Sequence, residues 1–241
     1  MNCGNVFNEK TVNIFTDASI HVYDREGYKE TIGCIGAIVV LTDINGDSQI
    51  IDECMTIQRN TTNNESEIKA IDAGVLLAST YKKAYDNINL FSDSKICIKG
   101  LTEWIFDWVD NAKNNILYTK SNSEVKNQKI FISIINFINR ASLNIKFYHQ
   151  KGHVSNTQKS ISNAKNVFSV SNSIPLDNIS DDFIKRISYY NNYVDYKTKE
   201  KLRDYINNNH ICKPKEFLGK YLFDINSTNI NISKYRNHII N

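Results

Sequence analysis

The chain has 241 residues, of which 41% are hydrophobic and 23% are charged, and its formal net charge is +3. This length and mixture suffice for one large domain with a full core, and they exclude a disordered or coiled-coil chain. The small positive charge does not by itself identify a class of partner.

The cysteines and the N-terminal residues indicate in which cellular compartment the protein is expected. The chain has five cysteines and no two form a C-x-x-C pair, so we expect free thiols in a reducing compartment, not disulfides or a zinc site. The start, MNCGNVFNEK, lacks the basic residues and apolar run of a signal peptide. No apolar stretch approaches the ~20 residues needed to cross a bilayer. We therefore expect a soluble, cytoplasmic monomer that does not contact membranes.

The first part of the chain predicts three antiparallel strands. Residues 11–17 alternate polar and apolar side chains and end at an acid. Residues 33–41 form a continuous apolar run rich in β-branched residues, which is typical of a central strand. Asn45-Gly46 is a turn signal, after which residues 49–57 return as a third strand.

Helices and strands then alternate. Residues 61–66 introduce a helix whose apolar residues recur at helical spacing. Residues 88–93 predict a short strand that again ends at an acid, and residues 94–109 predict a helix that breaks near Gly100.

The last predicted elements complete the fold. Residues 128–139 are strongly apolar, residues 143–149 alternate as a fifth strand, and an amphipathic helix runs from Ser180 to about residue 206. Three strands in a meander and two more, each preceded by a helix, predict a mixed five-stranded α/β sheet with helices on its faces.

Three acids stand where such a sheet places its functional crevice. Asp17 and Asp93 each end a predicted strand, and Glu67 lies in the first turn of a helix. Taken singly, each is explained equally well as a turn, capping or helix N-terminal residue. Together they would converge beyond the ends of central strands. Carboxylates without His or Cys ligands suit Mg²⁺ or Mn²⁺, and two such ions ~3.5–4 Å apart can clamp a phosphodiester.

Six segments, in this order, resemble the type 1 ribonuclease H family. They are TDAS (16–19), TTNNESEIKAI (61–71), LFSDSKICIKGLTEWIFDW (90–108), VKN (125–127), KGH (151–153) and NNYVDYKTKEKL (191–202). The resemblance implies a ribonuclease H-like fold and an endonuclease that cuts the RNA strand of RNA–DNA hybrids. It also implies two-metal catalysis with Mg²⁺, or alternatively Mn²⁺, that leaves 5′-phosphate and 3′-hydroxyl ends.

The resemblance assigns catalytic roles to five residues. The metal-binding acids of the family match Asp17, Glu67, Asp93 and Asp195. His153 matches a flexible histidine thought to assist proton movement or product release, and the ordinary pKa of histidine suits that role.

It also implies residues that contact the hybrid. Asn63 and Asn64 match residues that read the minor groove, where the 2′-OH identifies RNA. Thr62 and Asn127 match a pocket for a phosphate of the DNA strand. Trp104 and Trp108 match aromatic residues that line the channel for that strand. The alternatives are turn formation by the asparagines and ordinary helix packing by the tryptophans.

Four lysines in and just after the polar stretch that follows residue 109 also allow two interpretations. They form either a solvated face or a basic handle that grips the hybrid backbone. They are Lys113, Lys120, Lys126 and Lys129.

The sequence departs from the family pattern at two places. Ala18 follows Asp17 where the family usually has glycine, so a backbone contact to RNA is altered. Asp195 lies much farther from His153 than the family's last acid does, and Asn163, nearer the usual place, cannot supply a charge. We assign the role to Asp195 because NNYVDYKT reproduces the family's helix pattern.

Other acids in that part of the chain, Asp177, Asp181 and Asp182, fit loop and cap positions better. The expected organisation is a ribonuclease H domain over residues 10–207, with an insertion at 154–190, and a C-terminal extension over 208–241.

Two other functions remain open from the sequence. One is a nuclease of the same fold that cuts DNA junctions or double-stranded DNA, against which the Asn63-Asn64 pair and KGH argue. The other is a non-catalytic module that binds hybrids, against which the three well-placed acids argue.

Overall fold

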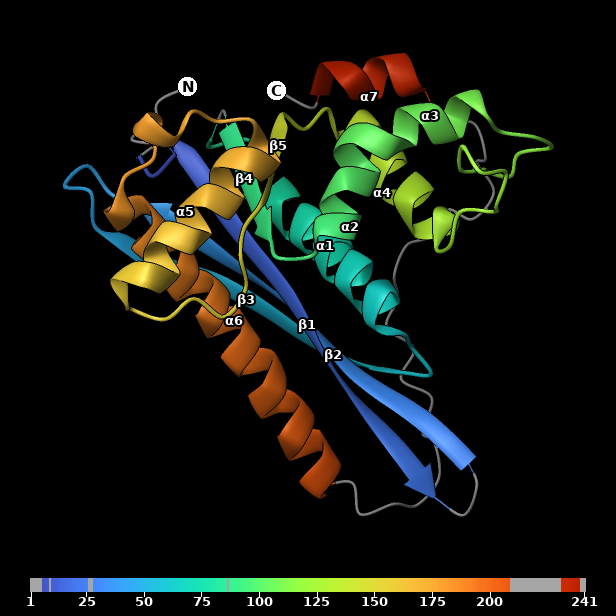
Figure 1. Ribbon diagram of the computed structural model, residues 1–241, viewed down its shortest axis with the longest axis horizontal. Coiled ribbons are helices and arrows are strands. Elements are labelled where there is room, and N and C mark those ends of the chain that lie inside the picture. The colour runs from blue at the N-terminus through green and yellow to red at the C-terminus, as the bar shows by residue number, and fades with distance from the viewer. Residues whose placement is uncertain (1–5, 9, 26–27, 86, 209–230, 239–241) are drawn as a thin grey trace.

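A five-stranded mixed sheet forms the centre of the protein, with strand order β3-β2-β1-β4-β5. The computed structural model describes residues 6–8, 10–25, 28–85, 87–208 and 231–238 (Figure 1). The antiparallel meander consists of β1 (Thr11–Arg25), β2 (Tyr28–Thr42) and β3 (Ser48–Arg59). The strands β4 (Asn87–Ser92) and β5 (Ile145–His149) run parallel to β1. The predicted fold class is confirmed.

The strands β1 and β2 are longer than the sequence pattern predicts. They pair with each other as far as Arg25 and Tyr28, whereas β4 pairs with β1 only up to Thr16 and Ser92. The ends of the meander therefore extend past the parallel strands as a ribbon (Figure 1). Asp17, the next residue of β1, and Asp93, the residue that follows β4, lie where the two strands separate.

Helices of the middle of the chain cover one face of the sheet. They are α1 (Asn63–Ser79), α2 (Lys95–Lys99), the π-helix η2 (Gly100–Trp104), α3 (Ile105–Asp110) and α4 (Gln128–Ala141). Their apolar side chains form one buried cluster with Val12 and Ile14 of β1. The short helix α7 (Ile232–His238) packs against α4, and its Tyr235 is part of the same cluster (Figure 1).

The opposite face carries α5 (Gln158–Asn172), the 3₁₀ turn η3 (Leu176–Asn178) and α6 (Asp181–Asn208). A row of stacked rings crosses this face from strand to strand. Phe15 lies 4.8 Å from Phe91, Phe91 5.0 Å from Tyr148, and Tyr148 5.8 Å from Phe168 of α5 (ring centroids). Such offset aromatic contacts add to the gain from apolar burial, so they fix the strands directly beneath Asp17 and Asp93.

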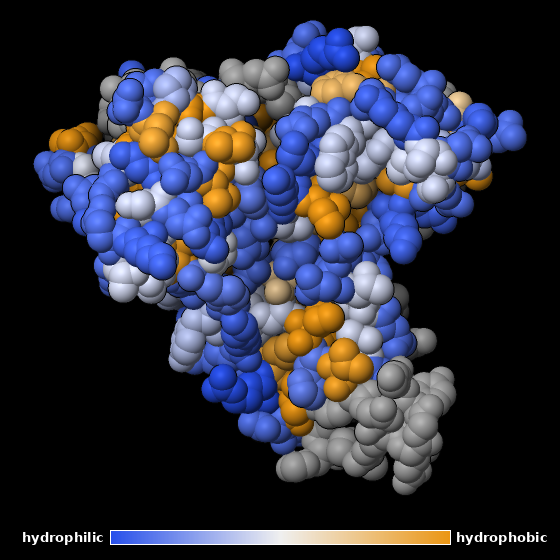
Figure 2. All heavy atoms as spheres, in the orientation of Figure 1, coloured by the Kyte–Doolittle hydropathy of each residue, from blue (hydrophilic) through white to orange (hydrophobic). Residues whose placement is uncertain are grey.

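The far end of α6 packs against the ribbon. Leu202 buries itself with Ile32 and Cys34 of β2. Figure 2 shows apolar residues gathered where this end of α6 meets the strands, on a face that is otherwise mostly hydrophilic.

Three details differ from the expectations or extend them. The break expected near Gly100 is a π-helical turn inside a continuous helical path. A side chain at this glycine would collide with the ring of Phe131, so the position has no room for a larger residue. The expected insertion contains α5, which packs on β5. The extension contributes α7.

The described cysteines carry free thiols, and Cys34 and Cys97 are buried. Cys3 and Cys212 lie outside the described residues. Within the described part of the chain, no helix combines the length and apolarity needed to cross a membrane.

Candidate metal centre

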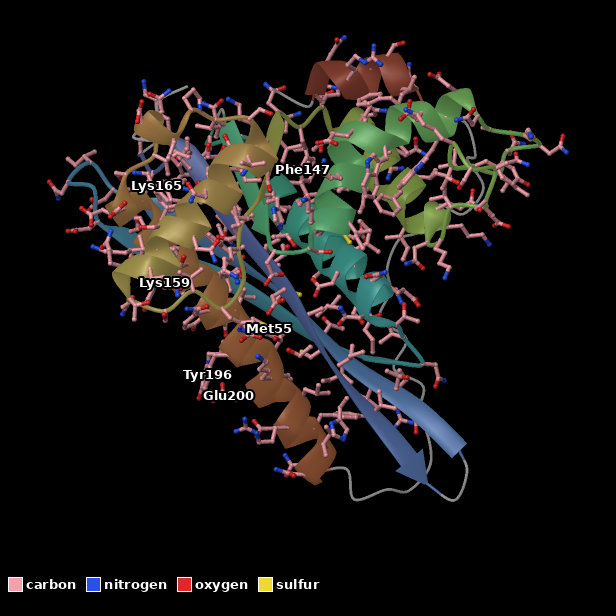
Figure 3. All side chains as sticks on the ribbon, in the orientation of Figure 1. Met55, Phe147, Lys159, Lys165, Tyr196 and Glu200 are labelled. Carbon is pink, nitrogen blue, oxygen red and sulfur yellow. The ribbon has the colours of Figure 1, made fainter. Side chains whose placement is uncertain are left out.

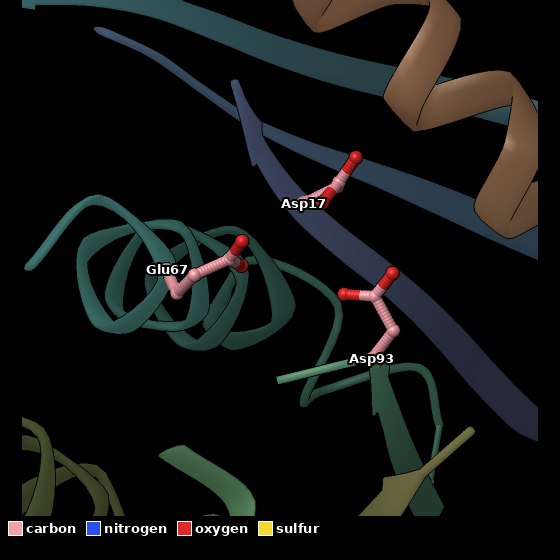
Figure 4. A group of neighbouring side chains, drawn as sticks. All are labelled: Asp17, Glu67 and Asp93. Carbon is pink, nitrogen blue, oxygen red and sulfur yellow. The ribbon is translucent and has the colours of Figure 1, made fainter. Parts of the chain in front are cut away.

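Three carboxylates from different elements meet at the point where β1 and β4 separate. Asp17 comes from β1, Glu67 from α1 and Asp93 from the residue after β4, and one ligand oxygen of each lies within 4.8 Å of the others. Figure 4 shows the three carboxylates directed toward a common space. The structure therefore brings together the three acids that the sequence placed at strand and helix ends.

Local interactions position Glu67. The hydroxyl of Thr62 caps α1 by accepting from the backbone N–H of Glu65 at 3.3 Å. Ile68 and Ile71 of the same helix are fully buried against the sheet. The rotation of α1 set by these residues turns Glu67 toward β1.

The carboxylates lie close together and largely out of water, which raises the cost of their negative charges. Burial, followed by repulsion from Asp93, Glu67 and Asp195, raises the pKa of Asp17 from 3.8 to about 10. Burial and the charges of Asp93 and Asp195 raise the pKa of Glu67 from 4.5 to about 8. Burial likewise raises the pKa of Asp93. Cations at this point would relieve the repulsion.

The oxygens present fit a hard divalent cation. Among the described residues, Oε2 of Glu67 is buried and has no hydrogen-bond partner. A buried acceptor without a donor is costly, and an ion coordinated by it removes that cost. A donor set of carboxylate oxygens alone matches Mg²⁺ or Mn²⁺ better than softer metals.

Asp195 reaches this site from α6 on the opposite face of the sheet. It lines the same pocket of about 590 Å³ as the other three acids, with Asn63 and His153. Its carboxylate lies 2.7 Å from Nζ of Lys199 and 3.7 Å from Nδ1 of His153. Asn163, the other position considered from the sequence, is exposed on α5.

Two features that sequence reasoning missed hold α6 against the sheet beside Asp17. Gly36 pairs with Asp17 across the strands, and a Cβ there would lie 2.5 Å from a methyl of Thr198. The hydroxyls of Thr198 and Ser19 lie 2.8 Å apart, and that of Thr198 also donates to the carbonyl of Asp195 at 2.9 Å. The absence of a side chain at Gly36 therefore allows Asp195 to approach. A lone glycine in an apolar strand carries no sequence signal for this contact.

Asp93 has equally close neighbours. A Cβ on Gly152 would lie 2.2 Å from its Oδ2, so the glycine of KGH is required by space. The amide of Asn191, which is 1% exposed, donates to the Asp93 carboxylate and stabilises its charged form. Gln150 in turn donates to Oδ1 of Asn191 at 2.8 Å. The family-like segment NNYVD includes Asn191, but nothing in the sequence indicated that Gln150 is its hydrogen-bond partner.

His153 is well placed to move. Its side chain is 73% exposed. Its backbone has a positive φ of 53°, a conformation uncommon outside glycine. His153 lines the acidic pocket, with its Nδ1 3.7 Å from the Asp195 carboxylate.

The residues expected to contact a hybrid occupy different surroundings. Asn63 lines the acidic pocket, whereas Asn64 is exposed at the start of α1. Asn127 lies in a separate shallow pocket of about 530 Å³ with Lys126 and Lys129.

The two tryptophans share the end of the helical path that begins after β4. Trp108 is 8% exposed and its ring packs edge-on against Phe131, at 5.2 Å between centroids. Trp104, whose ring lies 6.1 Å from that of Trp108, is partly exposed. Trp104 therefore offers more surface to a ligand than Trp108.

Comparison with known proteins identifies the family. The RNase H family model matches residues 9–166, well over half of the chain. The chain belongs to the RNase H family. It is therefore an enzyme of the ribonuclease H type, and its matched region ends before Asp195.

The individual relatives are moderately similar to this chain. Ribonuclease H of Clostridium botulinum is 31% identical over 147 residues, which cover 61% of this chain and 87% of that protein. Ribonuclease HI of Haemophilus influenzae is 35% identical over 101 residues, covering 42% and 59%. The solution structure of the PFV RNase H domain matches with a TM-score of 0.49 at 18% identity, covering 68% of this chain and 94% of that one.

Proposed function

We propose that the chain hydrolyses the RNA strand of RNA–DNA hybrids, with two divalent cations held by Asp17, Glu67, Asp93 and Asp195. The products would be a 5′-phosphate and a 3′-hydroxyl. The observation that carries this proposal is the group of three carboxylates within 4.8 Å in a chain of the RNase H family.

Mg²⁺ is the proposed ion and Mn²⁺ the alternative, because every candidate ligand is a carboxylate. When bound, such ions activate a water and stabilise the departing oxygen of a phosphodiester. Other residues of the chain position these acids. Gly36 and Thr198 allow Asp195 to approach the sheet, and Asn191 forms a hydrogen bond with Asp93.

His153 and the polar residues around the pocket complete the proposal. We assign proton movement or product release to His153, because its exposed ring faces Asp195 at 3.7 Å. We assign contacts with the 2′-hydroxyls of the RNA strand to Asn63 and Asn64. For the DNA strand, we assign phosphate binding to Thr62 and Asn127, and the channel wall to Trp104 and Trp108.

A cleavage panel tests the proposal. RNA–DNA, RNA–RNA and DNA–DNA duplexes, each end-labelled, are incubated with the protein in Mg²⁺, in Mn²⁺ or in EDTA. We expect cleavage of the RNA strand of the hybrid alone, dependent on the metal, with products that a phosphate-dependent 5′ exonuclease degrades. Equal cleavage of DNA–DNA duplexes would contradict the substrate, and tight hybrid binding without turnover in either metal would contradict catalysis.

A further inference from the structure

A second pocket lies at the outer edge of β5, away from the acids. It has a volume of about 520 Å³. Residues 95–103 form one wall, β5 forms the floor, and residues 171–174 at the end of α5 form the other wall. Figure 2 shows the surface hollowed between the α5 side and the α2 side. Figure 3 places Phe147, one of the floor residues, between these two sides.

Positive charge predominates in this pocket. Among the described residues that line it, Lys95, Lys99 and Lys146 are basic and Glu103 is the one acid. Glu103 is bound by Lys99 at 2.8 Å. Burial lowers the pKa of Lys146, which means that its ammonium group has lost part of its hydration.

Hydrogen-bond donors are available beside the lysines. β5 is an edge strand, and the N–H and C=O of His149 both face outward, where Asn172 binds them. Backbone groups of alternate residues in a strand point the same way, so the N–H of Phe147 faces the same edge. Ser173 also lines the pocket, as does Ser171, whose hydroxyl lies 2.9 Å from Nδ1 of His149. Backbone N–H, hydroxyl and ammonium groups together suit phosphate oxygens.

The pocket is joined to the acidic site by backbone. The N–H of Lys95 donates to the carbonyl of Asp93 at 3.1 Å. The buried ring of His149, one of the floor residues, is hydrogen-bonded to the backbone of Asp93 as well. Lys95 and His149 therefore place one end of this pocket beside Asp93.

We infer that this basic pocket binds phosphate groups of the nucleic-acid strand that extends from the acidic site past Asp93. The inference rests on the proposed function. It gives the protein a contact with its polynucleotide at a distance from the scissile bond, made in part by α5.

Salt-dependent binding tests the inference. The protein is first made inactive by Asp17→Asn, so that a fluorescent RNA–DNA hybrid stays intact, and its dissociation constant is measured by anisotropy between about 50 and 200 mM salt. Each phosphate contact contributes about 0.7 to 0.9 to the slope of log affinity against log salt. We expect Lys95→Gln with Lys146→Gln to reduce that slope by about 1.4 to 1.8.

The control is a matched double variant, Lys159→Gln with Lys83→Gln. Both of these lysines are exposed and neither lines the pocket. Lys159 is at the start of α5, well away from Phe147 (Figure 3). A slope unchanged from that of the parent protein is expected for the control. The inference is overturned if the pocket variant behaves like the control.

Shortened hybrids locate the contact. Trimming the hybrid stepwise from one end should abolish the difference between the parent protein and the pocket variant, and trimming from the other end should preserve it. A difference that persists in both series would mean that the lysines act through folding, for example by neutralising the carbonyl end of α5. Stabilisation by inorganic phosphate without any difference in hybrid slope would mean that the pocket takes small anions only. Either result overturns the inference.

The two proposals fail separately. A wild-type protein that neither binds nor cuts hybrids refutes the proposed function. A wild-type protein that does both, with a pocket variant like the control, refutes only the pocket assignment.

Discussion

At the scale of single residues, Asp17 is the carboxylate whose negative charge is most strongly disfavoured by its surroundings. It is 4% exposed and lies near three other carboxylates. Without a cation it cannot ionise at neutral pH without destabilising the fold. The same carboxylates that would bind metal therefore strain the metal-free protein.

This strain predicts how stability depends on pH. The pKa values of Asp17 and Glu67 are raised in the folded state, to about 10 and about 8, so the folded state binds protons more tightly than the unfolded state. The resulting stabilisation is complete below about pH 4 and is lost as pH rises toward those values. In EDTA, the melting temperature should therefore fall between about pH 5 and pH 8 through these two groups.

Mg²⁺ should reverse that loss, because a cation favours the ionised carboxylates. Melting curves in EDTA and in Mg²⁺ at each pH measure the effect, with Asp17→Asn as the control that shows a smaller response to both pH and metal. A melting temperature in Mg²⁺ equal to that in EDTA at about pH 8 would contradict the prediction.

Asp93 gives the most direct test of chemistry. Replacing Asp93 by Asn keeps the size of the side chain and its contact with Gly152 but removes the charge. We expect cleavage to fall by roughly 10³-fold or more, with hybrid affinity changed only a few-fold. Single-turnover cleavage and anisotropy measure the two quantities. Mg²⁺-dependent cleavage near the wild-type rate would count against the scheme.

At the scale of elements, the position of α6 determines whether the Asp195 carboxylate lies close to the other three acids. Gly36→Val would place methyl groups against Thr198, and the overpacking should cost about 1–3 kcal/mol of stability. Cleavage should fall further than stability alone explains, because Asp195 moves with the helix. A variant destabilised to a similar extent elsewhere, such as Ile138→Val in the buried face of α4, provides the control. Equal activity of the two variants below their melting temperatures would show that α6 does not position the site.

The sequence reveals some of these elements better than others. Strands β4 and β5 and the start of α1 are bounded by acids, caps and alternating residues, so Asp93 and Glu67 could be located. The ribbon of β1 and β2 could not be predicted at its full length, because its outer residues include many polar ones, among them His21, Asp24 and Glu30, that break the apolar pattern. The helix α5 was missed because its sequence is polar, with only Ile161, Ala164 and Phe168 buried among its described residues.

The distance along the chain from His153 to Asp195 also has a physical explanation in these elements. The helix α5 fills the space over β5, so the chain must complete α5 and η3 before α6 can cross the sheet beside β1. Sequence spacing alone could not distinguish this path from loss of the acid. The contacts between Thr198 and Ser19 join residues too far apart in sequence to be inferred from either one.

At the scale of the whole molecule, the C-terminal helix belongs to the core. Tyr235 is fully buried and its hydroxyl donates to the carbonyl of Leu101, in the π-helical turn, at 3.1 Å. The π-helical turn shifts the backbone hydrogen-bond register, and the tyrosine satisfies one of its carbonyls. The tail thus braces the helix that carries both tryptophans.

Tyr235→Phe should lower the free energy of unfolding by about 1–3 kcal/mol, because the Leu101 carbonyl is left without its donor in a buried place. Arg236→Ala is the matched control, since Arg236 lies over the ring of Phe106 at 4.6 Å and is exposed. Its loss should cost under about 1 kcal/mol. Denaturant titration measures both, and equal values would show that the hydroxyl contributes nothing.

The proposed metal site draws on both layers of the molecule, since Glu67 lies on α1 on one face and Asp195 on α6 on the other. The chain is synthesised from its N-terminus, so Asp195 leaves the ribosome well after Asp17, Glu67 and Asp93. A product of premature termination before Asp195 would keep most of the sheet yet lack one side of the site. If the proposed site is correct, we therefore expect nuclease activity to appear only after α6 has been synthesised.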